Sequence, residues 1–155
     1  MGKISSSLED YLEAIYIIES KNKVARITDI AQHLNISKPS VTKALKLLAE
    51  RDLINYEPYK YITLKGRGII LARKILNKHK ALKLFCDSVL YISEEDSDEI
   101  ACQMEHFVSC ENLQKFLLLI EFFQEHKDCA KLWRDKAKSA KNEKLNIYNI
   151  QLEDK

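Results

Sequence analysis

The stretch from Ile27 to Arg51, ITDIAQHLNISKPSVTKALKLLAER, predicts two helices separated by a short turn. The first helix covers residues 27–34, and the turn is formed by residues 35–37. Ser37 is suited to cap the second helix, and Pro39 fits a first helical turn, where a missing amide costs no hydrogen bond. Two short helices joined so tightly are typical of a helix-turn-helix, whose second helix enters the major groove of DNA.

The second helix, expected over residues 38–51 and called the recognition helix below, opens with short polar and basic side chains. Such side chains can approach base edges and phosphates, while Val41, Leu45 and Leu48 recur at helical spacing and are expected to pack behind them. A plain helical hairpin would not need this polar end, so we expect DNA as the partner. The residues expected to contact DNA here are Ser37, Lys38, Pro39, Ser40, Thr42, Lys43 and Lys46.

After Asp52 the sequence changes to short runs rich in aromatic and β-branched residues. Residues 53–56 and 61–64 flank the segment Glu57-Pro58-Tyr59-Lys60, which has a proline in a turn. This pattern predicts a small hairpin, or wing, beside the recognition helix. We expect Tyr59 and Lys60 at its tip to reach the DNA backbone.

The net charge of +2 conceals an uneven distribution. Residues 1–80 contain 15 Lys and Arg against 8 Asp and Glu, a balance of +7, whereas residues 81–155 contain 10 against 15, a balance of −5. A basic first half suits a protein that binds nucleic acid. The chain has 46% apolar residues but only 3 glycines and 2 prolines, which predicts a mainly helical protein with short connections.

The expected compartment is the cytoplasm. No apolar run approaches the ~20 residues that cross a bilayer, and residues 1–7 lack the apolar segment of a signal peptide. The four cysteines fall within helical patterns, so in that compartment we expect free thiols and not disulfides. They are Cys86, Cys102, Cys110 and Cys129.

Helical periodicity continues on both sides of the DNA-binding motif. A first helix is expected from about residue 7, with Ser6 or Ser7 as its cap, and a long helix is expected over residues 67–91. Ser93 should cap the helix that follows. Residues 113–123 are apolar enough to be buried against a partner, which for a chain of this length can be a second copy. An amphipathic last helix is expected from residue 129, ending in a polar tail.

Cys102, Glu105 and His106 place a thiol, a carboxylate and an imidazole at positions i, i+3 and i+4 of one expected helix. Such residues lie within roughly a 100° arc and can converge on one transition-metal ion. Thiolate and imidazole favour Fe, Ni, Cu or Zn, and the carboxylate widens the choice toward Mn. Asp10 and Glu13 share a face of the first helix, where acidic residues are also favoured by the helix dipole.

Five segments occur in a consistent order between about residue 7 and residue 123. They are LEDYLEAIY (8–16), DIA (29–31), SKPSVTK (37–43), YEPY (56–59) and CQMEH (102–106). Together they resemble the diphtheria toxin repressor family of metal-dependent transcriptional repressors. The resemblance implies a mainly α fold, with a winged helix-turn-helix domain over residues 1–66 and an all-helical metal-binding and dimerisation domain over residues 67–155. Without the SH3-like third domain of the iron-responsive members, the chain is most similar to the short manganese transport regulator branch.

The resemblance also implies a metal site, partners and a mechanism. The metal would be Mn2+ or Fe2+, and the partners would be operator DNA and a second copy of the chain. By holding the two domains in one orientation, the ion would let a homodimer bind a palindromic operator and repress metal-homeostasis genes. No residue would be catalytic. The implied ligands are Asp10, Glu13, His79, Cys102, Glu105 and His106.

Two positions depart from the family pattern. Cys102 stands where the manganese branch usually has a carboxylate and the iron branch has cysteine, so both metals remain open. Lys83 stands where the iron branch uses a glutamate in an ancillary metal site, which argues against such a site here.

Two other functions fit parts of the sequence. A metal-independent winged-helix repressor could sense a small molecule or an oxidant through Cys102 or Cys110, and it would not need Asp10 and Glu13. A metalloenzyme with Glu105 as general base would need an open coordination position and a substrate cleft, and no segment of the sequence predicts such a cleft.

Overall fold

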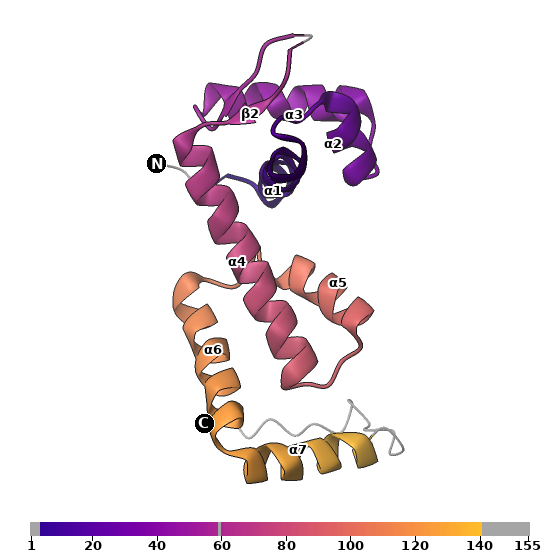
Figure 1. Ribbon diagram of the computed structural model, residues 1–155, viewed down its shortest axis with the longest axis vertical. Coiled ribbons are helices and arrows are strands. Elements are labelled where there is room, and N and C mark those ends of the chain that lie inside the picture. The colour runs from indigo at the N-terminus through magenta and orange to yellow at the C-terminus, as the bar shows by residue number, and fades with distance from the viewer. Residues whose placement is uncertain (1–3, 59, 141–155) are drawn as a thin grey trace, which may run out of the picture.

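The computed structural model describes residues 4–58 and 60–140, which form a mainly helical chain with one small antiparallel sheet (Figure 1). The long helix α4 runs from a first group of elements, a winged helix-turn-helix, to a second group that contains only helices (Figure 1). This confirms the predicted fold class. In chain order the elements are α1 (Ser6–Asn22), α2 (Ile27–His33), α3 (Lys38–Glu50), β1 (Ile54–Asn55), β2 (Thr63–Leu64), α4 (Gly66–Ser88), α5 (Glu94–Met104), α6 (Cys110–Glu125) and α7 (Lys127–Ala140).

Serine caps begin four of these helices. The capping residues are Ser5, Ser37, Ser93 and Ser109, and each side chain accepts a hydrogen bond from the amide three residues further along. Such a cap satisfies an amide that has no partner within the helix and contributes about 1 kcal/mol. The expected caps at Ser37 and Ser93 are confirmed. The first helix begins earlier than expected because Ser5, and not Ser6 or Ser7, is its cap.

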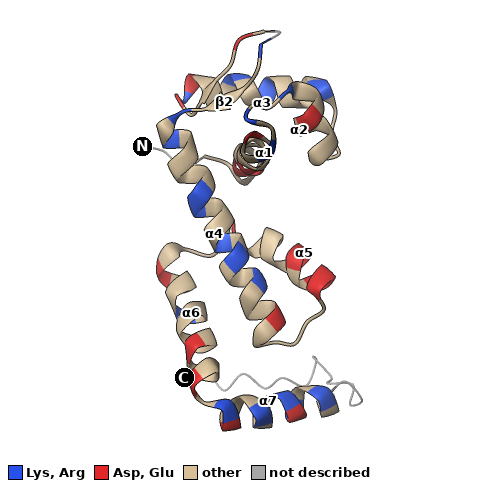
Figure 2. Ribbon diagram, viewed as in Figure 1, with Lys and Arg blue, Asp and Glu red and all other residues tan. Residues whose placement is uncertain are grey.

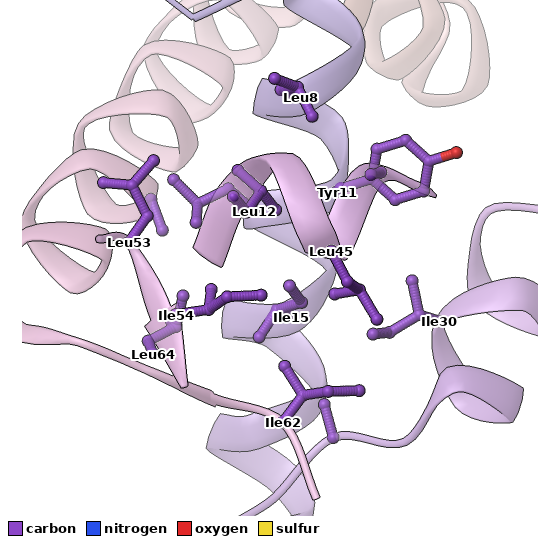
Figure 3. Close-up of a cluster of buried hydrophobic side chains, with 14 of the residues drawn as sticks. Leu8, Tyr11, Leu12, Ile15, Ile30, Leu45, Leu53, Ile54, Ile62 and Leu64 are labelled. Atoms are coloured by element: carbon purple, nitrogen blue, oxygen red, sulfur yellow. The ribbon is translucent and has the colours of Figure 1, made fainter. Parts of the chain in front are cut away.

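The core of the first group lies between α1, α3 and the sheet (Figure 3). Leu12 and Ile15 of α1 are fully buried there, as are Val41, Leu45 and Leu48 of α3. Full burial of a leucine or isoleucine side chain contributes roughly 1.5–3 kcal/mol. The expectation that the apolar face of the recognition helix packs inward is therefore confirmed, and this packing leaves its polar face outward.

The wing is shorter than predicted but has the predicted topology. β1 and β2 pair antiparallel, with Ile54 opposite Leu64 and Asn55 opposite Thr63. The Asn55 amide donates a hydrogen bond to the Thr63 hydroxyl at 3.0 Å, and the Glu19 carboxylate accepts one from the Leu64 amide at 2.9 Å. The wing is thus held to α1 by its base. The predicted DNA contact Tyr59 lies outside the described residues.

Helix α4 belongs to both cores. Ala72 and Ile75 near its start are buried in the first core, while Phe85 and Cys86 near its end are buried in a second core with residues of α6. The rings of Phe85 and Phe116 meet edge to face with centroids 4.8 Å apart. The helix ends at Ser88, three residues before the predicted end. One continuous helix therefore couples the two groups.

The last helices present apolar side chains to solvent. The Trp133 indole of α7 donates a hydrogen bond to the Val89 carbonyl at 2.6 Å, which ties α7 to the end of α4. The predicted polar tail after residue 140 lies outside the described residues. Within residues 4–58 and 60–140, no helix combines the length and the apolar character that a membrane span requires. The exposed apolar residues of α6 and α7 are Leu117, Leu118, Leu119, Phe122, Leu132 and Trp133.

Candidate metal centre and DNA-binding surface

Three potential metal ligands meet where α1 passes the turn between α5 and α6. His106 Nε2 lies 2.9 Å from Asp10 Oδ1 and 3.7 Å from Glu105 Oε1. Ligand atoms of these three residues all lie within 4.8 Å of one another. Asp10 belongs to the first group of elements, here called the helix-turn-helix unit. Glu105 and His106 belong to the second group, here called the helical unit. The cluster therefore joins the two units.

The segment that supplies Glu105 and His106 is not the continuous helix that the sequence predicts. Helix α5 ends at Met104, Glu105 is its C-cap residue, and His106 lies in the turn that follows. The Phe107 amide donates to the Met104 carbonyl at 3.0 Å, a tight bond of the kind that closes helix ends. The predicted continuous helix through Cys102, Glu105 and His106 is therefore wrong at its end, and the turn brings His106 against Asp10 of α1.

The cluster fits a divalent metal ion. The Glu105 side chain is only 1% exposed, and among the described residues its Oε1 atom has no hydrogen-bond partner. A buried carboxylate oxygen without a partner is costly, and a bound cation would offset that cost. Ligands about 2.2 Å from one ion lie at most about 4.4 Å apart, so small side-chain rotations would complete the site. Two carboxylates and an imidazole suit Mn2+ or Fe2+.

His79 and Glu13 flank Glu105. His79 Nδ1 lies 2.9 Å from Glu105 Oε2, and this hydrogen bond is the main reason that the pKa of His79 is raised. Burial, and then the negative charge of Glu105, raise the pKa of Glu13 to about 7. Burial also raises the pKa of Asp10. Burial and mutual repulsion therefore disfavour the charged forms of Asp10 and Glu13, and a bound cation would stabilise those charged forms.

Cys102 lies at the surface and outside the cluster of Asp10, Glu105 and His106. Partial burial of the thiol, followed by the charge of Glu105, raises the pKa of Cys102. Of the six predicted ligands, Asp10, Glu105 and His106 converge, and His79 and Glu13 adjoin Glu105. Cys102 is not in the converging group, but its thiol is near enough for the charges of Glu105, Asp10 and Glu13 to raise its pKa. Direct ligation by all six stays a prediction.

Sequence reasoning missed two acidic residues that contact the histidines. Glu9 is buried, and its Oε2 lies 2.8 Å from His106 Nδ1. Asp98 Oδ1 lies 3.3 Å from His79 Nε2. Carboxylates in such positions orient the imidazoles of metal sites. The sequence could have indicated Asp98, because it lies four residues before Cys102 and so on the same face of the predicted helix. For Glu9, which follows the apolar Leu8, no sequence pattern predicts a contact with a histidine.

The recognition helix, α3, presents most of the predicted DNA contacts to solvent. Thr42 is half-buried, and its hydroxyl donates to the Lys38 carbonyl at 3.0 Å. The exposed members of the predicted set on and beside α3 are Ser37, Lys38, Pro39, Ser40, Lys43 and Lys46. Basic residues recur along α3 (Figure 2). Contact of these residues with DNA stays a prediction.

A hollow of about 590 Å³ separates the recognition helix from the wing. Thr42, Lys46 and Lys60 from the predicted set line it, and Lys60 is paired with Glu57. Arg26, which sequence reasoning missed, also lines the hollow, and its guanidinium lies 5.2 Å from the centre of the Tyr61 ring. Tyr61 and Thr28 are further lining residues without a predicted role.

The fold and these two sites define a winged-helix transcriptional regulator with a candidate metal centre. The family described as iron dependent repressor, N-terminal DNA binding domain, matches residues 3–62. The accompanying family described as iron dependent repressor, metal binding and dimerisation domain, matches residues 65–134. The chain belongs to this iron-dependent repressor family of metal-dependent DNA-binding regulators, which confirms the resemblance to the diphtheria toxin repressor family.

This chain matches two curated relatives over most of their length. An uncharacterized HTH-type transcriptional regulator of Methanocaldococcus jannaschii is 42% identical over 123 residues, which are 79% of this chain and 98% of the relative. The HTH-type transcriptional regulator MntR of Geobacillus kaustophilus is 30% identical over 129 residues, 83% of this chain and 91% of MntR. The similarity to MntR supports the assignment to the manganese transport regulator branch.

Solved structures share the fold. The manganese regulator SloR is 25% identical with a TM-score of 0.66, and the match covers 78% of this chain and 55% of SloR. IdeR of T. acidophilum has the same TM-score at 23% identity, covering 78% of this chain and 56% of IdeR. The chain thus spans little more than half the length of these two structures.

Proposed function

We propose that this chain is a transcriptional repressor that binds palindromic operator DNA as a homodimer when Mn2+ or Fe2+ is bound. The observation that carries the proposal is the contact between Asp10 and His106. Asp10 belongs to the unit that contains the recognition helix, and His106 belongs to the unit beyond α4. An ion bound by both residues would join the two units.

The mechanism follows from binding linkage. An ion that prefers one arrangement of two units shifts the population toward that arrangement, and a coupling of ~1–3 kcal/mol tightens DNA binding by ~5–150-fold. The bound ion would supply positive charge between the carboxylates of Asp10 and Glu105. Glu9 holds the other ring nitrogen of His106 and so orients the imidazole toward Asp10.

Dimerisation is part of the same proposal. A monomer leaves the exposed apolar residues of α6 and α7 in water, and the matching family includes a metal-binding and dimerisation domain. Two recognition helices related by a two-fold axis would read half-sites about one helical turn of DNA apart, or a multiple of it.

The choice between the two metals depends on the donor atoms. Asp10 and Glu105 supply oxygen donors that suit Mn2+, and the similar proteins named above include MntR and the manganese regulator SloR. Cys102 is the one soft donor among the predicted ligands and would favour Fe2+. Because Cys102 is an exposed residue and the pKa of its thiol is raised, the oxygen donors of Asp10 and Glu105 carry the proposal.

A metal-independent thiol sensor is less well supported. A reactive cysteine needs a lowered pKa, whereas that of Cys102 is raised. The relatives are regulators, and we propose no catalytic role for Glu105. We also propose a cytoplasmic location and a domain division into residues 1–66 and 67–155, with Gly66 as the first residue of α4.

The test is DNA binding at defined metal concentrations. A random DNA library would be selected anaerobically with Mn(II), and the recovered sequence would then be titrated with Mn(II), Fe(II), Zn(II) or a chelator. We expect a palindromic sequence whose affinity rises at least fivefold with Mn(II) or Fe(II). Equal affinity in the presence of the chelator would contradict metal dependence and favour the metal-independent sensor, which Cys102→Ser and Cys110→Ser variants would then test.

A further inference from the structure

A cavity of about 500 Å³ lies where the helix-turn-helix unit, α4 and the turn between α5 and α6 meet. Apolar side chains from all three parts line it: Ile4 and Leu53 from the first, Leu71 and Ile75 from α4, and Val108 from the turn. Sites for small organic molecules have volumes of about 300–1,000 Å³ and mostly apolar walls. The cavity therefore has room for a small molecule with an apolar body.

The charged side chains around this cavity are mostly basic. Among the described residues that line it, Glu9 is the one acidic side chain, and its Oε2 atom lies 2.8 Å from His106 Nδ1. Residues 4–58 and 60–140 provide no ion-pair partner for Lys74 or Lys78. An anion in the cavity would supply such a partner. The basic residues that line the cavity are Arg51, Arg67, Lys74 and Lys78.

The cavity adjoins the candidate metal centre through Glu9. This residue is only 7% exposed, lines the cavity and contacts His106, whose other ring nitrogen lies 2.9 Å from Asp10. Arg51 lines the cavity from the helix-turn-helix unit and Val108 lines it from the helical unit. A molecule that fills the cavity would therefore contact both units while Asp10 meets His106, and it would favour that arrangement.

We propose that this cavity binds a small organic anion, a carboxylate or phosphate ester with an apolar body, and that the bound anion assists the metal ion in raising DNA affinity. The binding of the anion is independent of the proposed function, whereas its effect on DNA binding rests on that function. Binding linkage then requires that the anion and the metal ion strengthen each other's binding by the same factor.

The experiment uses the full chain and three probes that share one aromatic ring system. Naphthylacetate has a carboxylate, naphthyl phosphate has a phosphate ester, and naphthylethanol has no charge. Naphthalene fluorescence measures the dissociation constant of each probe, first with a chelator and then with Mn(II). Equilibrium dialysis measures the dissociation constant of Mn(II) with and without each anion, and fluorescence anisotropy of the selected DNA measures the Mn(II) concentration for half-maximal binding.

Four variants separate the charge of the cavity from its volume. Lys74→Met and Lys78→Met each remove one cation and keep most of the side-chain volume. Leu71→Trp fills the cavity, and Lys80→Met is the matched control on an exposed lysine of α4 that does not line it. Circular dichroism identifies any variant that does not fold, and the two lysine variants, which change side chains outside both cores, keep the test valid if Leu71→Trp fails.

With the chelator, we expect the wild-type chain to bind at least one of the two anions more tightly than naphthylethanol, and the tighter anion identifies the head group. Lys74→Met and Lys78→Met should each weaken the binding of that anion by roughly 10-fold, the usual effect of losing a charged hydrogen bond, and should leave naphthylethanol unchanged. Leu71→Trp should weaken the binding of all three probes, and Lys80→Met should behave as wild type.

With Mn(II), the anion should lower the dissociation constant of Mn(II) by roughly fivefold or more, and Mn(II) should lower that of the anion by the same factor. DNA binding should then require correspondingly less Mn(II). This effect of the anion should be lost in Leu71→Trp and kept in Lys80→Met.

Three results would overturn parts of the inference. Equal affinities for the anions and naphthylethanol, or anion binding that Lys74→Met and Lys78→Met do not weaken, would contradict the anion site. Anion binding that leaves the dissociation constant of Mn(II) unchanged would contradict its regulatory role. DNA affinity that does not respond to Mn(II) would contradict the proposed function and the regulatory role together, whereas anion binding measured with the chelator would still support the site.

Discussion

His106 Nε2 lies 2.9 Å from Asp10 Oδ1, and this contact joins the turn after α5 to the first helix of the DNA-binding unit. Glu9, the neighbour of Asp10, lies 2.8 Å from the other ring nitrogen. The imidazole of His106 is therefore held between two consecutive carboxylates of α1. An ion bound at this place would contact both units of the protein, through Asp10 on one side and through His106 and Glu105 on the other.

Replacing His106 with alanine should uncouple metal from DNA binding. The variant removes a ligand together with its contacts to Asp10 and Glu9, so the Mn(II) concentration for half-maximal DNA binding should rise by at least about 100-fold, the upper range for losing an outer partner. Fluorescence anisotropy of labelled operator measures this. His126→Ala, at an exposed histidine of the α6–α7 junction, is the control and should behave as wild type. An unchanged Mn(II) requirement in His106→Ala would remove His106 from the site.

The metal-free protein should lose stability as pH rises. The pKa of Glu13 is raised from 4.5 to about 7 in the folded state, so folding favours its protonated form, and that contribution is lost between about pH 4.5 and 7. The raised pKa of His79 acts in the same direction at higher pH. Discounted for partial exposure, the Glu13 contribution is about 1–2 kcal/mol.

Urea unfolding with a chelator at pH 5 and pH 8 measures this effect. Glu13→Gln should retain about 1–2 kcal/mol that the wild-type chain loses over this range, because the amide does not ionise. In the presence of Mn(II) the dependence should reverse, since the ion binds the ionised carboxylate and releases a proton. Identical pH profiles for the two proteins would show that Glu13 is ionised normally.

Cys102 tests the choice of metal. Cys102→Glu introduces the carboxylate that is usual in the manganese branch, and it should lower the Mn(II) concentration needed for DNA binding relative to Fe(II). Cys129→Ser, at an exposed cysteine of α7 with no proposed role, controls for general effects of thiol removal. The measurement is the ratio of activating Mn(II) and Fe(II) concentrations under anaerobic conditions. If that ratio does not change, the thiol does not contact the activating ion.

Lys43 and Lys46 of the recognition helix test the DNA-binding surface. Alanine at either position should weaken DNA binding and reduce the slope of log K against log salt by about 0.9 for each phosphate that the side chain no longer neutralises. Ser40→Ala should alter the preferred sequence instead. Lys131→Ala on α7 serves as the control, because α7 lies at the opposite end of the molecule from α3 (Figure 1). Equal salt slopes for all of these proteins would contradict the assigned surface.

Gly68 tests the junction between the wing and α4. A Cβ atom there would lie 2.1 Å from the Leu53 carbonyl oxygen, whereas one at Gly66 would meet nothing within 4 Å. The Leu53 oxygen also accepts a hydrogen bond from the Lys65 amide, so it cannot move freely. Gly68→Ala should lower the free energy of unfolding by about 1–3 kcal/mol. Gly66→Ala should match or exceed the wild-type stability in the same urea titration, and equal effects of both changes would contradict this packing.

The sequence by itself determined the features that depend on neighbouring residues. The turn at residues 35–37, the cap at Ser37 and the inward spacing of Leu45 are local, because a helix forms through contacts three and four residues apart. The resemblance carried by residues 102–106 identified the region of the metal centre for the same reason, since the motif is contiguous.

Only the tertiary structure decided how that motif is used. The end of α5 at Met104 turns His106 toward Glu9 and leaves Cys102 at the surface. These positions depend on how α1 packs against α4 and where the α5–α6 turn lies against them, which involves residues far apart in the chain. The contact between Asp98 and His79 has the same origin, because it forms only when α5 packs on α4. Local periodicity specifies which side of a helix is buried, but the partner that meets that side is set by the packing of the whole chain.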